Sequence, residues 1–482
     1  MVNSDLFLLF KTLTNKEIKQ LSAFIDSPFA NKIRYRPEAQ ILLKILQKHA
    51  GTESEALLAK QNIYKQVFPG KEVVSGLLER VMFELAQAIR LVLVTERYLD
   101  DKNALTVQLD YAEILQSRGI TAKADLIAHQ TLAEIEKNRF KSAREYGKAF
   151  EASFMIHSMA SQKNRRKDDL QIANTLKYLE LYYTLSKLDL VNHYLVLNKF
   201  SKLESPEDAV HVNTFIAPPE FDVEEAPTIV IAYKIYLLLS DKRPTKEGFE
   251  DLLRLLRKYE TQLSEVSVKA FFSYLRNYCT LMINDGYFEF FPVLHQIHLD
   301  NLAKGYFLYQ GKMAPGAYMN ITNCALRSKK ENWALDFIQE YKDKIMEARD
   351  YEQAYYLNMA SYYFHIRDFD KALDFLPAAS DHLEQHLIGR KLELQIYYEM
   401  RSDLLEYKLE AFKMYIRRAS QKLLSEYNRE RHANFANLLQ QLALTTPGDK
   451  ERARRILGRI EEKTQLTEKE WLIEQAKKML IK

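Results

Sequence analysis

The sequence predicts an all-α protein: an α-solenoid of antiparallel helix hairpins, with a small helical region at its N-terminus. Apolar residues recur at helical spacing in nearly every segment of the 482 residues. Glycine, which phosphate loops and the tight turns of sheets require, occurs only 13 times, about half its usual share. A repeat that follows the tetratricopeptide pattern is visible beyond residue 310. These three observations favour stacked helices over any sheet architecture.

The first clear element is a helix that begins after Thr14. Thr14 and Glu17 form a Thr-x-x-Glu capping box, in which each side chain accepts a hydrogen bond from the other residue's backbone N–H. An apolar stripe follows at helical spacing, formed by Ile18, Leu21 and Ile25. Pro28 ends the helix because the residue before a proline is pushed out of the α region. Phe29 is expected to be an apolar plug beyond this end. We interpret the segment as a capped helix that packs on its neighbours, rather than as a docking or DNA-reading helix.

Composition and pattern divide the chain into five regions. They are an N-terminal helical region (1–100), helical hairpins (101–204), a Pro-rich loop (205–227), tetratricopeptide-like repeats (228–420) and a C-terminal helical cap (421–482). The loop holds four of the twelve prolines, which lack the backbone N–H that a strand needs. A linker or exposed loop is therefore favoured there, with a partner-docking loop as the alternative.

The repeat pattern predicts which residues meet where paired helices cross. Ala360 and Ala372 are the small residues that let two helices approach closely, and Tyr363 and Phe369 fill the space beside them. Ala334 takes the place of Ala372 one repeat earlier. The distance from 334 to 372 is 38 residues, close to the tetratricopeptide period of about 34. A third, weaker copy reads GRKLELQIYYEMRSDLLEYKLEAF.

Stacked hairpins of this kind form one continuous core and a concave surface, because a single hairpin cannot bury its apolar face alone. Such a groove binds peptides, protein segments or, occasionally, nucleic acid. The groove-facing positions on the first helix of the two clearest repeats are Asn323, Arg327, Ser361 and His365. These four residues are the candidate partner contacts. Charge reversal of Arg327 together with His365→Ala is expected to weaken partner capture without lowering the melting temperature.

Five segments, in order over most of the chain, carry a family resemblance. They are FKTLTNKEIKQLSAFIDSPFANK, LELYYTLSKLDL, ALDFIQEYKDKI, NMASYYFHIRDFDKALDFL and EWLIEQAKKM. With them the chain resembles an uncharacterised bacterial family of all-helical, tetratricopeptide-like repeat proteins of similar length. It departs from that family in a shorter loop at 205–227 and in Lys329–Asn332, which replaces a turn glycine. The resemblance implies a helical, repeat-containing cytoplasmic protein and assigns no active site.

Motifs for catalysis and cofactor binding are missing from the sequence. Gly70 and Lys71 lack the glycine that a phosphate loop places upstream, and no G-x-G-x-x-G occurs. Cys279 and Cys324 lie in apolar or repeat-interface segments, so we interpret them as core residues rather than nucleophiles. No C-x-x-C motif occurs. We therefore predict a protein that is not an enzyme and uses no cofactor.

Two histidine pairs have spacings that a metal site can use. His382 and His386 are four residues apart, but the glutamate of a zinc-protease motif does not follow His382 and no third ligand is evident. His295 and His298 lie three apart with Asp300 nearby, and here too the pattern is incomplete. No metal is predicted at either pair.

The charge distribution gives no strongly basic face. The net charge is +4, and residues 401–482 hold 18 Lys and Arg against 12 Asp and Glu. The helix predicted over 450–463 points Ile456, Leu457 and Ile460 inward and Arg452, Arg455 and Arg459 outward. This basic patch is either a solvated cap of the solenoid or a surface for an acidic partner or nucleic acid.

The leading hypothesis is a non-enzymatic scaffold or adaptor whose groove binds a segment of a protein or peptide partner. The alternative is a nucleic-acid-associated regulator, with residues 1–100 as a helical reading head and the repeats as its sensor. The N-terminal apolar run is too short for a signal peptide. No window approaches the roughly 18 uninterrupted apolar residues of a membrane span. A cytoplasmic location without membrane contact is expected.

Overall fold

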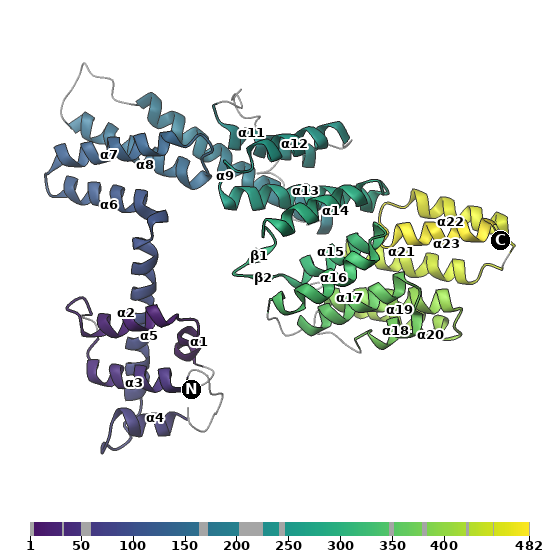
Figure 1. Cartoon of the computed structure of the whole chain (residues 1–482), viewed down its shortest axis with the longest axis horizontal. Coiled ribbons are helices and arrows are strands. Elements are labelled where there is room, and N and C mark those ends of the chain that lie inside the picture. Colours follow the sequence, from purple (N-terminus) through teal and green to yellow (C-terminus); the bar gives the residue numbers. More distant parts are fainter. Residues whose placement is uncertain are drawn as a thin grey trace. The chain divides into compact units, whose positions relative to one another are not determined.

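Helices dominate the computed structural model, and the only sheet in its described part is one two-stranded hairpin (Figure 1). The structure describes residues 4–30, 33–49, 59–162, 172–201, 225–240, 246–346, 351–377, 383–420, 424–446 and 448–481. The predicted all-α class is confirmed. No helix within these ranges combines the length and apolarity that crossing a bilayer requires.

Contacts between helices divide the chain into two compact units. The first comprises Met1–Glu136 and Lys148–Thr175, and the second comprises Lys137–Gly147 and Leu176–Lys482. The helices that belong mainly to the first unit are α1 (Asp5–Lys11), α2 (Asn15–Asp26), α3 (Arg36–His49), α4 (Lys60–Val67), α5 (Leu77–Leu99), η1 (Asp101–Asn103), α6 (Ala104–Ser117), α7 (Thr121–Lys137) and α8 (Ala143–Gln162).

The long helix α5 organises the N-terminal part of the first unit, because α1, α2, α3 and α4 all pack against it. The capping box of α2 is confirmed: the Thr14 N–H donates to Glu17 at 2.6 Å, and the Glu17 N–H donates to the Thr14 hydroxyl at 3.3 Å. Phe29 is 83% exposed, so the expected apolar plug is wrong. A turn in which the Ala30 N–H donates to the Ser27 carbonyl buries Ala30 instead and leaves Phe29 outside.

The second unit continues from α9 to the last helix, and neighbouring helices pack on one another along it. Its elements are α9 (Ile172–Ser201), α11 (Pro227–Ser240), α12 (Lys246–Tyr259), α13 (Glu265–Asp285), α14 (Phe290–Ala303), β1 (Leu308–Tyr309), β2 (Lys312–Met313), α15 (Pro315–Arg327), α16 (Glu331–Tyr341), η2 (Lys342–Lys344), α17 (Tyr351–His365), α18 (Phe369–Asp374), α19 (Leu383–Met400), α20 (Leu404–Arg418), α21 (Glu426–Ala443), α22 (Lys450–Glu462) and α23 (Lys469–Ile481). Alternate helices also touch: α11 contacts α13, α15 contacts α17, and α17 contacts α19. Of the predicted Pro-rich loop, residues up to 224 lie outside the described ranges.

Four helix-to-helix turns of the second unit share one backbone conformation. Each contains a residue with positive φ: Gly286, Lys329, Arg367 and Arg401. In every case the next residue's N–H donates to the carbonyl five positions earlier, which satisfies a free carbonyl at the helix end. The turn residues are 43, 38 and 34 positions apart (286 to 329, 329 to 367 and 367 to 401). At Lys329 a lysine thus occupies the conformation that glycine adopts most easily.

The predicted small residues lie where the helices cross. Ala360 of α17 and Ala372 of α18 are both fully buried in one cluster, and Tyr363 and Phe369 pack against it. Ala334 of α16 is likewise fully buried. The small side chains at these positions are therefore part of the buried core between helices.

The hairpin β1–β2 was not anticipated from the sequence. Leu308 pairs with Met313 and Tyr309 with Lys312, which leaves Gln310 and Gly311 at the turn, both with positive φ. Two successive residues with positive φ are the signature of a two-residue hairpin turn.

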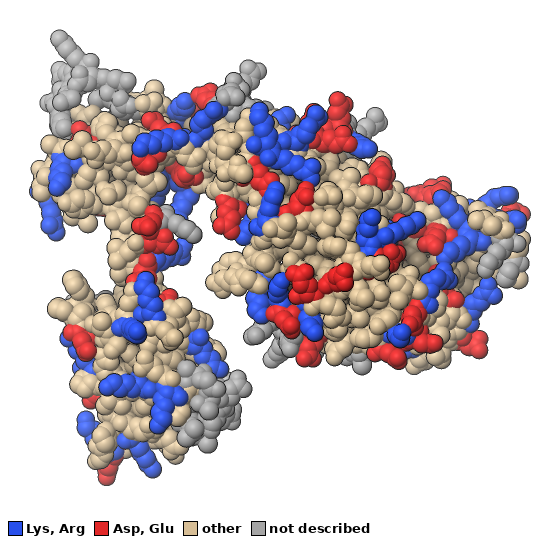
Figure 2. All heavy atoms as spheres, in the orientation of Figure 1, with Lys and Arg blue, Asp and Glu red and all other residues tan. Residues whose placement is uncertain are grey.

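The last helices pack together, since α22 contacts α21 and α23. Ile456 and Ile460 of α22 are buried, whereas Arg455 and Arg459 are exposed and Arg452 is half-buried. Figure 2 shows Lys and Arg side chains interspersed with Asp and Glu on its visible face, rather than gathered by sign.

Candidate functional site

A cavity of about 1110 Å³ lies among helices of the second unit. All four predicted contact residues, Asn323, Arg327, Ser361 and His365, line it. Its other walls come from α13, α19 and α21, and from the segment that leads into α23. We call this space the main cavity.

Residues at fixed distances before the four shared turns line the main cavity. The residues six positions before the four turn residues all line it: Thr280, Asn323, Ser361 and Gln395. So do the residues nine positions before: Asn277, Asn320, Asn358 and Leu392. Equivalent positions of successive helices thus face one space, and seven of these eight side chains are polar.

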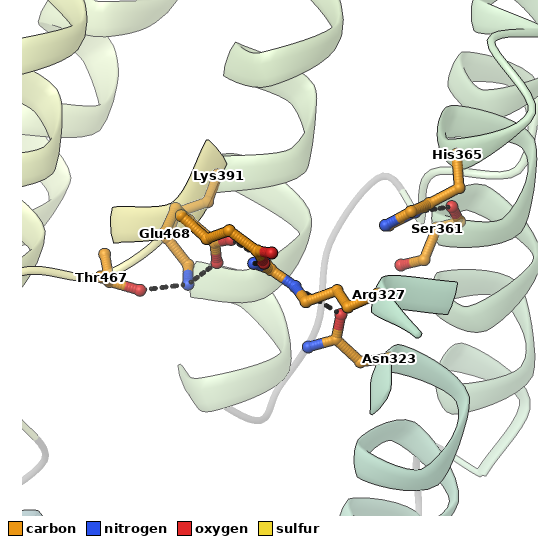
Figure 3. A network of polar contacts seen from close by, with 8 residues as sticks. Asn323, Arg327, Ser361, His365, Lys391, Thr467 and Glu468 are labelled. Carbon is orange, nitrogen blue, oxygen red and sulfur yellow. Dashed lines mark hydrogen bonds and ion pairs between the residues drawn. The ribbon is translucent and has the colours of Figure 1, made fainter. Parts of the chain in front are cut away.

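Arg327 points toward Glu468, just before α23, and pairs with its carboxylate (Figure 3). It also pairs with the carboxylate of Glu470 in the first turn of α23. One guanidinium nitrogen donates to Glu470 at 2.9 Å, and another donates to Glu468. Its Nε also donates to the Asn323 side chain at 3.2 Å. Charge reversal here would place a third carboxylate beside two others. We therefore expect it to destabilise the unit, contrary to the sequence-based expectation of an unchanged melting temperature.

Glu468 joins two helices that are far apart in the sequence. Its second carboxylate oxygen accepts from the Lys391 ammonium at 2.8 Å, and that ammonium also donates to the Thr467 hydroxyl at 2.9 Å. Glu468 itself has φ of 55°, which costs an L-residue about 1 kcal/mol. The paired cations hold the carboxylate in place despite that cost.

The surroundings favour the charged forms of Glu468 and Arg327. Burial alone would raise the pKa of Glu468, but Lys391 and Arg327 outweigh it and hold that pKa well below its usual range. Burial likewise opposes the charge of Arg327, yet Glu468 and Glu470 raise its pKa overall. Glu468 and Arg327 are therefore both charged at neutral pH.

His365 and Ser361 lie on α17, one helical turn apart. The His365 Nδ1–H donates to the Ser361 carbonyl at 2.9 Å (Figure 3). Burial lowers the pKa of His365, although this hydrogen bond partly opposes the shift. A neutral histidine and a hydroxyl therefore face the main cavity from this helix.

The predicted basic patch is not part of the main cavity. The Arg459 guanidinium donates to the Gln441 side chain at 3.0 Å, and Arg455 lies 3.9 Å from Glu451. Both contacts are on the exposed surface of the C-terminal helices, and none of the three arginines lines the main cavity.

The described histidines of the two predicted pairs are each packed into the protein. His382 lies outside the described residues, and His386 packs against Tyr415 with ring centroids 4.7 Å apart. His295 and His298 are both buried in α14. Across the described ranges no three His, Cys, Asp or Glu side chains are grouped so that they could hold a metal ion.

Both cysteines are buried, as expected of core residues. Cys279 is completely buried, and burial raises its pKa. Burial also raises the pKa of Cys324, to about 12, and its thiol lies 3.6 Å from the Phe291 carbonyl. Neither thiol is poised to ionise near neutral pH.

Comparisons of the chain with protein-family models, curated proteins and solved structures found no match.

Proposed function

We propose that the second unit is an α-solenoid of tetratricopeptide-like helix hairpins whose inner surface binds a segment of another protein. The observation that carries the proposal is the register of the main cavity. Residues at fixed distances before four equivalent turns all line that one space. This is the relationship that stacked repeats produce, because each first helix presents the same positions to the concave side.

The chemistry of the lining suits a polypeptide ligand. Asn277, Asn320 and Asn358 occupy one equivalent position in successive hairpins. Each side-chain amide carries both donors and acceptors, which match the N–H and C=O groups of an extended backbone. Pockets for small molecules usually span about 300–1,000 Å³. The main cavity, at about 1110 Å³, exceeds that range and has room for several residues of a peptide.

The family resemblance and the composition extend the same proposal. We assign the chain a non-enzymatic scaffold or adaptor role in the cytoplasm, similar to the bacterial helical-repeat proteins that it resembles. The partner is a protein or peptide segment rather than a membrane. Mixed charge on the visible surface agrees with this choice over nucleic acid (Figure 2).

A substitution that fills the main cavity tests the proposal. Ser361→Arg places a long side chain in the cavity, whereas Ser240→Arg makes the same change at an exposed position outside its lining. Tagged full-length proteins are used to capture partners from native lysate for identification by mass spectrometry. We expect a partner that binds wild type and Ser240→Arg and is lost with Ser361→Arg.

The captured partner is then purified, and its affinity for the three proteins is measured directly. Equal affinity for wild type and Ser361→Arg, with both proteins folded by circular dichroism, would show that binding does not use this cavity.

A further inference from the structure

Arg276 of α13 holds a positive charge in a partly buried position without a carboxylate. Its guanidinium lies 4.4 Å from the centroid of the Phe307 ring, and one terminal nitrogen is buried without a hydrogen-bond partner. No described Asp or Glu forms an ion pair with it. Burial lowers the pKa of Arg276 to about 10. A buried cation without a counter-charge is costly, so such a group is normally paired.

His298 lies beside Arg276 and also lacks a partner. It is 4% exposed, its ring packs edge-on against Phe307 at 5.6 Å, and its Nδ1 has no hydrogen-bond partner. Burial, with help from Arg276 and His295, lowers the pKa of His298 to about 3. At neutral pH this ring is therefore a neutral group that can donate one hydrogen bond.

Both residues line a second cavity of about 340 Å³, which we call the Arg276 cavity. It adjoins the main cavity, since residues such as Asn277 and Arg327 line both. The carboxylates in its wall are Glu468 and Glu470, and both pair with Arg327. Amide and hydroxyl groups make up much of the remaining polar wall: Ser273, Asn277, Thr280, Asn284 and Asn320.

We propose that the Arg276 cavity binds the oxyanion group, carboxylate or phosphate, of a ligand, with Arg276 as its charged partner and His298 as a hydrogen-bond donor. The planar guanidinium can offer two parallel N–H groups to such an anion. The wall carboxylates are already neutralised by Arg327 and Lys391, so they do not cancel the charge of Arg276. The bound anion supplies the counter-charge that the protein itself does not provide.

The same chemistry can come from a free small anion or from an acidic side chain of a segment in the main cavity. Three probes separate these sources: inorganic phosphate, succinate, and a capped peptide of five glutamates with its five-glutamine counterpart. Binding to the full-length protein is measured by isothermal titration calorimetry at constant ionic strength. We expect one saturable site for at least one of the anionic probes.

The variant Arg276→Gln should weaken that binding by about tenfold or more, because a charge-assisted contact is lost. Arg254→Gln is the matched control, since Arg254 is 78% exposed on α12 and lies outside the cavity. The control should bind within about twofold of wild type. If Arg276→Gln does not fold, Arg276→Lys keeps the charge without the planar fork and should bind whichever anionic probe binds wild type several-fold more weakly than wild type does.

The three probes distinguish a free ligand from a side chain of a bound partner. Phosphate or succinate bound through Arg276 indicates a free ligand, and glutamate peptide bound alone through Arg276 indicates a partner side chain. The proposal is overturned if no anionic probe binds or if the Arg276 variants bind as wild type does. A glutamine peptide that binds as tightly as the glutamate peptide also contradicts it. That last result leaves the proposed peptide-binding groove intact.

Discussion

The ammonium of Lys391 lies 2.8 Å from the carboxylate of Glu468, although 77 residues separate the two in the chain. Together with Arg327, this pair ties α19 and α15 to the segment that leads into α23. These contacts contribute to the stability of the second unit and to the shape of the main cavity. It fixes the position of one cavity wall relative to two others.

Glu468→Gln should therefore destabilise the second unit. The change leaves the largely buried Lys391 without a charged partner, and we expect the free energy of unfolding to fall by about 3 kcal/mol. Both tryptophans, Trp333 and Trp471, belong to this unit, so urea unfolding followed by tryptophan fluorescence reports on it alone. Glu474→Gln, at an exposed pair with Lys478, should change the free energy of unfolding by no more than about 0.5 kcal/mol. Equal effects of the two variants would refute the structural role of the network.

The second unit should also lose stability as the pH falls from about 6.5. The pKa of His298 is lowered to about 3 in the folded state, so the unfolded chain takes up this proton first. Stability is then complete above the unfolded pKa and declines as the pH falls toward 3. Each such histidine contributes a slope of up to about 1.4 kcal/mol per pH unit.

Urea titrations between pH 7 and 5 measure this slope. The substitution His298→Gln should reduce the slope by up to about 1.4 kcal/mol per pH unit. His129→Gln is the control, because His129 is exposed and belongs to the first unit. An unchanged slope in His298→Gln would contradict the buried neutral histidine.

Ala360→Leu should destabilise the second unit by about 1–3 kcal/mol, because no space is left for a larger side chain between α17 and its neighbours. Ala303→Leu, at an exposed position near the end of α14, should have little effect. Thermal unfolding of both variants checks the prediction. A melting temperature for Ala360→Leu equal to that of wild type would mean that the helices do not meet closely at this residue.

Lys329→Gly should leave stability unchanged or raise it by up to about 1 kcal/mol. The lysine has φ of 58°, a conformation that glycine adopts without the cost paid by an L-residue. Greater freedom of glycine in the unfolded chain partly offsets this gain. Lys330→Gly, where φ is −118°, lacks the gain and should be destabilising. Thermal unfolding distinguishes the two, and a large loss with Lys329→Gly would argue against the left-handed turn.

The alternative role in nucleic-acid binding predicts association that weakens steeply with salt. We expect no mobility shift of DNA or RNA by the wild-type protein even at low salt, since charges of both signs are interspersed on the visible surface (Figure 2). A shift that disappears at higher salt, and that Arg455→Gln with Arg459→Gln abolishes, would favour the alternative.

Local features of the fold are predictable from the sequence because their causes lie within a few residues. The capping box at Thr14 needs only Glu17 three positions on, and Ala360 and Ala372 belong to one hairpin. The hairpin turn at Gln310 was missed because glutamine rarely has positive φ. Phe29 was misplaced because a short turn, rather than its hydrophobicity, decides its exposure.

The site is less predictable, because its key contacts are long-range. Asn323, Arg327, Ser361 and His365 follow from repeat register, and they do line one cavity. No local pattern pairs Glu468 with Lys391 or reveals that Arg276 lacks a carboxylate. One further cavity residue could have been found from the repeat spacing. Gln395 lies 34 residues after Ser361 and six before Arg401, and it also lines the main cavity.

The four left-handed turns also determine which insertions and deletions the second unit can accept. A complete hairpin added between two turns would lengthen the row of inward polar side chains and leave every other residue facing as before. A single residue added inside α15 or α17 would instead rotate everything beyond it by about 100° around the helix axis. Under the proposed solenoid, length variation should therefore occur in whole hairpins, and the length of the proposed groove should change in steps of one hairpin.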